Sequence, residues 1–186
     1  MTPKNIMRMI RNIVPALALF AVMAGGGIAQ AGELPIGDPM EKNGMELQGI
    51  FLQAVMMEPA TAGQEPEKTD IHLEIDIVTL KGNENGFAAG SWVPYLGVYY
   101  MMTKTGSDWT SKGHLHGMVA ADGPHYGANV KLDGPGEYTV TFHIQPPSVN
   151  GFKRHFDKET GVGPWWKPFD YSGSFIFAGT GKKGSY

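Results

Sequence analysis

Residues 70–77 read DIHLEIDI, and this stretch decides the fold class of the chain. Polar and apolar residues alternate strictly, which is typical of a β-strand with one buried face. One face carries the apolar residues and the other the polar ones: Ile71, Leu73, Ile75 and Ile77 against Asp70, His72, Glu74 and Asp76. Same-face neighbours on a strand lie about 6.5–7 Å apart, so His72 and Glu74 could both reach one ion. The stretch predicts a strand and part of a metal site.

Strand-like runs fill most of the remaining chain. They cover residues 45–56, 70–80, 92–103, 115–119, 128–132, 137–145 and 171–178. The stretches between them are rich in Gly, Pro, Asn and Asp, including residues 105–111 and 121–127. No segment shows a long 3.6-residue periodicity. This spacing predicts an all-β protein, an immunoglobulin-like β-sandwich of about seven strands in a single domain.

Residues 132–140 read LDGPGEYTV and place Tyr138 just after a tight turn, near the start of a strand. This arrangement is typical of the tyrosine corner of immunoglobulin-like sandwiches. An ordinary hairpin with a tyrosine at an exposed edge fits the same residues.

The segment 146–170 is less regular than the rest and is rich in aromatic residues. These are Phe152, Phe156, Trp165, Trp166 and Phe169. So many aromatic side chains predict that the segment packs down, either onto the sandwich or onto a partner subunit.

The first 31 residues have the features of a secretory signal peptide. Three basic residues precede an apolar run at 13–24, and Ala29-Gln30-Ala31 forms a small-residue cleavage pattern. The apolar run is about 12 residues, short of the about 20 that span a bilayer. We expect a signal peptide at 1–31, cleaved near Ala31, and a metal-binding domain at 32–186. An uncleaved N-terminal anchor is the alternative.

The charge and the absence of cysteine restrict the function. Residues 1–31 hold three of the 15 Lys and Arg and none of the 18 Asp and Glu, so the chain after Ala31 carries a formal charge of −6. A mildly acidic exported domain suits cations and is a poor candidate for nucleic-acid binding. Blue-copper sites, iron–sulfur clusters and thiolate zinc sites all need cysteine. Any metal here must be held by His, carboxylate, Met or backbone oxygen.

The remaining candidate ligands lie later in the chain. His125 occurs in the stretch DGPHYG, where Gly and Pro predict a turn with the imidazole at its tip; Met118 precedes it by seven residues. His155 lies in the aromatic segment. Imidazole suits copper, zinc and iron, thioether favours copper, and carboxylate suits Cu(II), iron and manganese. Together with His72 and Glu74, these residues could serve either oxidation state of copper.

Other residues near this set have two interpretations each. Asp70 and Asp76 could orient a metal-bound histidine from behind. His114 and His116 alternate with Met118, so they could form a second docking point for metal, or only a solvated polar face. We expect His143 to be structural.

Several motifs along the chain resemble the bacterial periplasmic iron-transport protein family. They are ELPIGDP at 33–39, NGME at 43–46, DIHLE at 70–74, NGF at 85–87, PYL at 94–96, DGPHYGAN at 122–129, RH at 154–155 and ETGVG at 159–163. The match covers essentially the whole chain after the leader, in one order. Members of that family are exported homodimers with an immunoglobulin-like fold that accompany inner-membrane iron permeases. They bind copper, with iron or manganese as related guests.

The resemblance implies the metal ligands His72, Glu74, Met118, His125 and His155. It therefore predicts a periplasmic metal-binding protein of iron uptake that holds copper and assists delivery of iron to a permease. A copper-dependent iron oxidase or reductase is the alternative. A third hypothesis is an exported interaction module that binds a partner through its aromatic segment and holds no metal.

Overall fold

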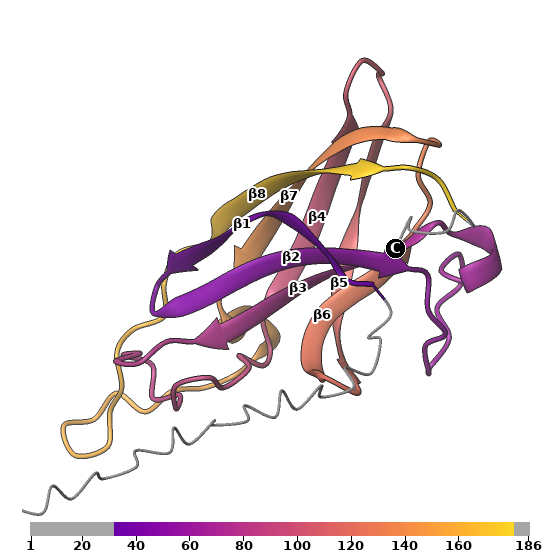
Figure 1. The fold of residues 1–186 in the computed structure, drawn as a ribbon. Helices are drawn as coiled ribbons and strands as arrows, with labels where there is room; N and C mark the ends of the chain where they lie inside the picture. Colours follow the sequence, from indigo (N-terminus) through magenta and orange to yellow (C-terminus); the bar gives the residue numbers. More distant parts are fainter. Residues whose placement is uncertain (1–31, 181–186) are drawn as a thin grey trace, which may run out of the picture.

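The computed structural model describes residues 32–180, and the regular secondary structure of this part of the chain consists almost wholly of β-strands (Figure 1). The strands are β1 (Leu34–Lys42), β2 (Met45–Gln53), β3 (Ile71–Thr79), β4 (Gly97–Lys104), β5 (Thr110–Ala120), β6 (Gly123–Val130), β7 (Gly136–Gln145) and β8 (Phe169–Phe177). Two short 3-10 helices, Pro66–Lys68 and Pro147–Asn150, lie in connections. The predicted signal peptide at 1–31 falls outside the described residues. Within residues 32–180, no helix has the length and apolar character needed to cross a membrane.

All the strand pairs are antiparallel and follow one another in the order β1-β2-β3-β6-β5-β4-β7-β8. Strand β5 connects two layers, a first layer of β1, β2, β3 and β6 and a second layer of β4, β7 and β8. Its residues up to Leu115 pair with β4 and those from His116 pair with β6. The ends of the series also meet: a methyl group built on Gly37 of β1 would lie 2.9 Å from Cα of Gly173 in β8. The all-β prediction is confirmed, and the strands form a nearly closed, barrel-like sheet. The immunoglobulin-like sandwich remains a prediction.

The core lies between the two layers. Phe51 of β2 and Phe175 of β8 have ring centroids 4.4 Å apart, and a methyl group on Gly49 would meet the Phe142 ring of β7 at 2.9 Å. The predicted apolar face of β3 is fully buried there. Each such Ile or Leu side chain contributes roughly 1.5–3 kcal/mol relative to an exposed one.

The structure differs from the predicted strands in three places. Strand β1 was missed, because Pro35, Gly37 and Pro39 interrupt its pattern; proline is tolerated there since β1 lies at the end of the series. Residues 92–96 precede β4 as a loop, with Tyr95 at a φ of 62°. Strand β5 begins at residue 110, within the turn-rich stretch 105–111 and ahead of the predicted strand at 115–119, and β6 begins at residue 123, within the turn-rich stretch 121–127.

The tyrosine corner is present. The Tyr138 hydroxyl donates a hydrogen bond of 2.6 Å to the carbonyl oxygen of Gly134, four residues upstream. The Tyr138 ring is fully buried. This contact ties the turn before β7 to the core.

The aromatic segment packs onto its own chain. The rings of Phe152 and Trp165 both lie near Phe87, with centroids 6.3 and 6.4 Å from it. The backbone N–H of Gly163 also donates to the Glu84 carbonyl oxygen at 2.7 Å. Phe156 is the exception, with 84% of its surface exposed.

Candidate metal centre

Three potential ligands meet on the outer side of the first layer. His72 and Glu74 come from β3 and His125 from β6, and one ligand atom of each lies within 4.8 Å of the others. Oε2 of Glu74 is 3.7 Å from Nε2 of His72 and 3.3 Å from Nε2 of His125. All three side chains are buried. Neither Nε2 atom has a hydrogen-bond partner within the described part of the chain. Two buried, unpartnered nitrogens beside a carboxylate form a cluster that suits a cation.

The tautomer of His72 is fixed by Asn129, which lies directly opposite it on β6. The Asn129 amide group donates to the carbonyl oxygens of Val55 (2.7 Å) and Gln64 (2.8 Å). Its Oδ1 is therefore an acceptor, and Nδ1 of His72 donates to it at 2.9 Å. The lone pair of His72 is then on Nε2, facing the centre. Such an orienting contact is usual for metal-bound histidine.

A short hairpin brings Met118 to the same site. The turn at residues 121–122 joins β5 to β6 and places Met118 directly opposite His125. Met118 lines a cavity of about 540 Å³ together with His72, Glu74 and His125. The prediction that His125 lies at the tip of a turn is wrong, because His125 lies within strand β6 and pairs with Met118 of β5. This pairing is what buries the imidazole.

Burial leaves the cluster without net charge near neutral pH. It lowers the pKa of His72 to about 4, although the hydrogen bond to Asn129 opposes the shift. Burial also lowers the pKa of His125. It raises the pKa of Glu74 to about 8, and nearby carboxylates, first that of Asp76, add to the rise. Both imidazoles are neutral and able to bind a metal, and a cation would displace the Glu74 proton.

A glycine makes room for the imidazole nitrogens. A methyl group on Gly127 would lie 2.5 Å from Nε2 of His72 and 3.3 Å from Cδ2 of His125. Gly127 pairs with Glu74 across β3 and β6, so it sits at the middle of the cluster. Any side chain here would fill the space in which an ion would sit. Gly127 and Asn129 were both missed by the sequence analysis; their only signal was that they follow His125 at two-residue spacing on one strand.

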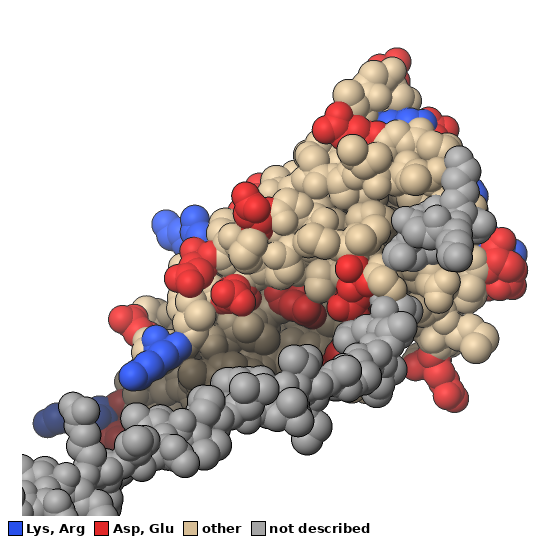
Figure 2. All heavy atoms as spheres, in the orientation of Figure 1, with Lys and Arg blue, Asp and Glu red and all other residues tan. Residues whose placement is uncertain are grey.

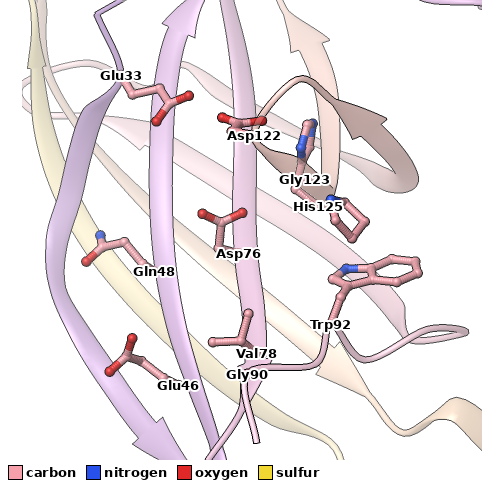
Figure 3. Close-up of a pocket in the computed structure, with 11 residues that line it drawn as sticks. Glu33, Glu46, Gln48, Asp76, Val78, Gly90, Trp92, Asp122, Gly123 and His125 are labelled. Atoms are coloured by element: carbon pink, nitrogen blue, oxygen red, sulfur yellow. The ribbon is translucent and has the colours of Figure 1, made fainter. Parts of the chain in front are cut away.

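A second cavity of about 430 Å³ adjoins His125 and is lined by carboxylates (Figure 3). Figure 3 shows Glu33, Asp76 and Asp122 around one hollow, with His125 beside them. Glu46 also lines this cavity. Figure 2 shows several acidic side chains on the face formed by β1 to β3. The negative field of these groups favours the approach of cations.

His155 lies apart from the cluster within its own chain. Its segment packs on residues 84–87, which follow the end of β3, whereas His72 lies at the beginning of that strand. The His155 side chain is 74% exposed. Its Nδ1 lies 2.7 Å from Oγ1 of Thr160, whose hydroxyl donates to Asp157 at 2.8 Å. Thr160 therefore accepts from Nδ1, so the lone pair of this exposed imidazole is on Nε2.

The two predicted orienting aspartates have different surroundings. Asp70 is not an orienting residue for the centre, because its carboxylate binds Lys131 at 2.9 Å and the backbone N–H of Leu132 at 2.7 Å. Asp76 lines the acidic cavity next to His125, and burial raises its pKa.

The other histidines lie outside the cluster. The rings of His114 and His116 are 4.5 Å apart on β5. His143 forms an ion-pair contact of 2.7 Å with Asp170 on the surface of the second layer.

The fold and this donor set define an all-β domain with a preassembled cluster of side chains that could hold a metal ion. The profile of the Fe2+ transport protein family matches residues 30–179. The chain belongs to this family.

Known relatives are similar over most of their length. A UPF0423 protein of Brucella abortus (strain 2308) is 50% identical over 186 residues, covering 98% of this chain and 100% of the relative. The structure of "as isolated" FetP from uropathogenic Escherichia coli strain F11, expressed in the periplasm, is 50% identical with a TM-score of 0.76; the match covers 80% of this chain and 97% of FetP. The copper-reconstituted P19 protein of Campylobacter jejuni is 47% identical with a TM-score of 0.78; the match covers 81% of this chain and 99% of P19.

Proposed function

We propose that this chain is a periplasmic metal-binding protein of iron uptake that holds copper in the cluster of His72, Glu74, Met118 and His125. The observation that carries the proposal is the pair of buried Nε2 atoms, both without a hydrogen-bond partner, beside the Glu74 carboxylate. Leaving such atoms unpaired is unfavourable unless a ligand occupies the space. The relatives FetP and P19 support a periplasmic, copper-binding protein.

The donor chemistry favours copper over other ions. The imidazoles of His72 and His125 suit both oxidation states, the thioether of Met118 favours Cu(I), and the carboxylate of Glu74 favours Cu(II). Iron or manganese would use the harder donors, Glu74 and the imidazoles. The carboxylates of the adjoining cavity would concentrate Fe2+ near the centre. The protein would then assist delivery of that iron to an inner-membrane permease.

His155 is proposed to complete the site from a second copy of the chain in a homodimer. It is exposed, its Nδ1 is bound to Thr160, and its segment is anchored beyond the end of β3, whereas the cluster begins near the start of that strand. The cluster itself is buried, so a further ligand would reach it through the cavity that it lines. The His155 side chain of the same chain is held away from that cavity, whereas the exposed His155 of a second copy could enter it.

Copper titration of the purified full chain against a competing chelator tests the site. The wild-type protein is expected to bind one tight copper per chain, and the double variant Met118→Ala/His125→Ala is expected to lose it. His143→Ala is the matched control, because His143 is exposed and lies in the second layer. Unchanged affinity in the double variant would refute the site.

Mixing two defective variants tests whether His155 is supplied by the partner. His155→Ala and His125→Ala are each expected to bind copper weakly. Consider a two-fold dimer in which each site takes His155 from the partner: a hybrid of one His155→Ala chain and one His125→Ala chain then has one intact site of two. Random exchange makes about half of all dimers hybrid, so about a quarter of all sites are restored. Ligation within one chain would restore none. Sedimentation of each variant confirms that it still dimerises.

The alternative function, a copper-dependent iron oxidase or reductase, shares the same centre. It predicts turnover of Fe2+ or Fe3+ by the copper-loaded chain above the rate of an equal amount of free copper. A pure binding protein shows no turnover above that rate.

The predicted export and cleavage are tested by N-terminal sequencing of protein recovered from the periplasm. The sequence is expected to begin just after Ala31.

A further inference from the structure

We propose that His114 and His116 form a second cation-binding site, a pair of imidazoles on β5, one half-buried and one exposed, that binds Cu2+ or a divalent ion of similar preference. Both lie outside the cluster of His72, Glu74 and His125. Their ring centroids are 4.5 Å apart and their planes are nearly perpendicular, at 85°. Two imidazoles this close can share one ion, with water in the remaining positions; imidazole is a preferred ligand of copper and zinc.

The change of layer in β5 brings these rings together. Leu115 pairs with β4 and His116 pairs with β6, so the strand passes from one layer to the other between them. Leu115 is fully buried, and the histidines on either side of it project away from the core. Same-face side chains on a regular strand are about 6.5–7 Å apart. The observed ring separation is shorter, which favours binding by both imidazoles.

Neighbouring residues restrict the ring of His114 and leave the ring of His116 exposed to solvent. Tyr99 lies directly opposite His114, and their ring centroids are 5.0 Å apart. This contact restricts the His114 ring. His116 is exposed and lies opposite Gly127, which has no side chain to cover it. An ion from solvent can therefore reach His116 first and His114 second.

The pair lies next to the metal centre. Met118 is the next residue on the same face of β5, and it lies opposite His125. Lys112 continues that face beyond His114. Its positive charge repels a cation at that end, while the carboxylates of the cavity beside His125 attract one at the other. We assign the pair a role in loading the centre through Met118; this role rests on the proposed function, whereas binding by the pair does not.

Titration of the untagged full chain with Cu2+ alone tests the binding. The wild type is expected to show a tight class and a weaker class of site, and electron paramagnetic resonance of the weaker class is expected to show two coupled nitrogens. His114→Ala/His116→Ala should lose the weaker class, and the conservative His116→Gln should reduce its coupled nitrogens to one. His143→Ala, the exposed control on the same outer surface, should keep both classes. Retention of the weaker class by the double variant would overturn the proposal.

A variant without the centre separates this proposal from the proposed function. His125→Ala should lose the tight class and keep the weaker one; loss of both would mean that the weaker signal belongs to the centre and that the pair is no site. For the loading role, stopped-flow mixing at less than one Cu2+ per chain should show several-fold slower filling of the tight site in His114→Ala/His116→Ala. An unchanged filling rate would refute the loading role.

Discussion

Nδ1 of His72 lies 2.9 Å from Oδ1 of Asn129, the residue directly across from it on the neighbouring strand. The same amide binds the backbone of Val55, so a single side chain both selects the His72 tautomer and fixes a loop that lines the cavity. The proposed metal centre would thus depend on a residue that does not itself touch the ion.

Asn129→Ala should weaken copper binding about 10- to 100-fold, because the His72 ring loses its fixed tautomer. Competition with a chelator measures the change. Asn85→Ala is the matched control, since that amide also joins two loops, through Gly163 and Pro164, but far from the centre. Equal affinities of Asn129→Ala and the wild type would show that the contact does not orient His72.

Gly127→Ala should abolish tight copper binding, since its methyl group would lie 2.5 Å from Nε2 of His72. Gly117→Ala on the adjacent strand is the control, because its nearest contact, the Trp92 ring, would be at an ordinary 3.4 Å. Isothermal titration with Cu2+ compares the two variants. Tight binding by Gly127→Ala would contradict the position assigned to the ion.

Glu74→Gln should change how the stability of the metal-free protein depends on pH. The pKa of Glu74 is raised from 4.5 to about 8 in the fold, so the folded state holds its proton more tightly than the unfolded chain. The contribution of this proton is complete below pH 4.5 and is lost as the pH rises to about 8. Metal-free Glu74→Gln should therefore gain stability relative to the wild type over this range, on the order of a few kcal/mol.

Urea unfolding of both proteins at pH 5 and pH 8 measures this difference. His72 does not confound the comparison, since burial affects its pKa in both proteins in the same way. A difference between the two proteins that is the same at both pH values would contradict a raised Glu74 pKa. Saturating copper should reverse the order at pH 8, because the metal binds the wild type more tightly and stabilises it by mass action.

Tyr138→Phe should lower the free energy of unfolding by about 1 kcal/mol, because it removes the hydrogen bond to Gly134 and keeps the buried ring. Gly134 is exposed, so water can replace the lost donor and the loss stays small. Tyr100→Phe, which removes a longer contact of 3.2 Å to Ser111, should change stability less. Copper affinity should be unchanged in both variants, since neither tyrosine is near the centre.

Much of the strand architecture could be predicted from local pattern. Alternation in residues 70–77 predicted β3 and the face on which each residue lies. The tight turn just before Tyr138 predicted the tyrosine corner. Strand β1 was missed because its two prolines and a glycine conceal the alternation, and this end strand forms through pairing with β2. His125 was misplaced because Gly123 and Pro124 indicate a turn, whereas pairing on both sides keeps β6 extended.

The sequence by itself determined an all-β chain and the position of the two candidate ligands, His72 and Glu74, on one strand face, because side-chain direction along a strand follows from a two-residue period. Only the tertiary structure decided that His125 joins them, that Gly127 leaves room and that Asn129 orients His72. These depend on which strands pair and in which register, and register is fixed by contacts between residues far apart in the chain. The same dependence separates His155 from the cluster within one chain.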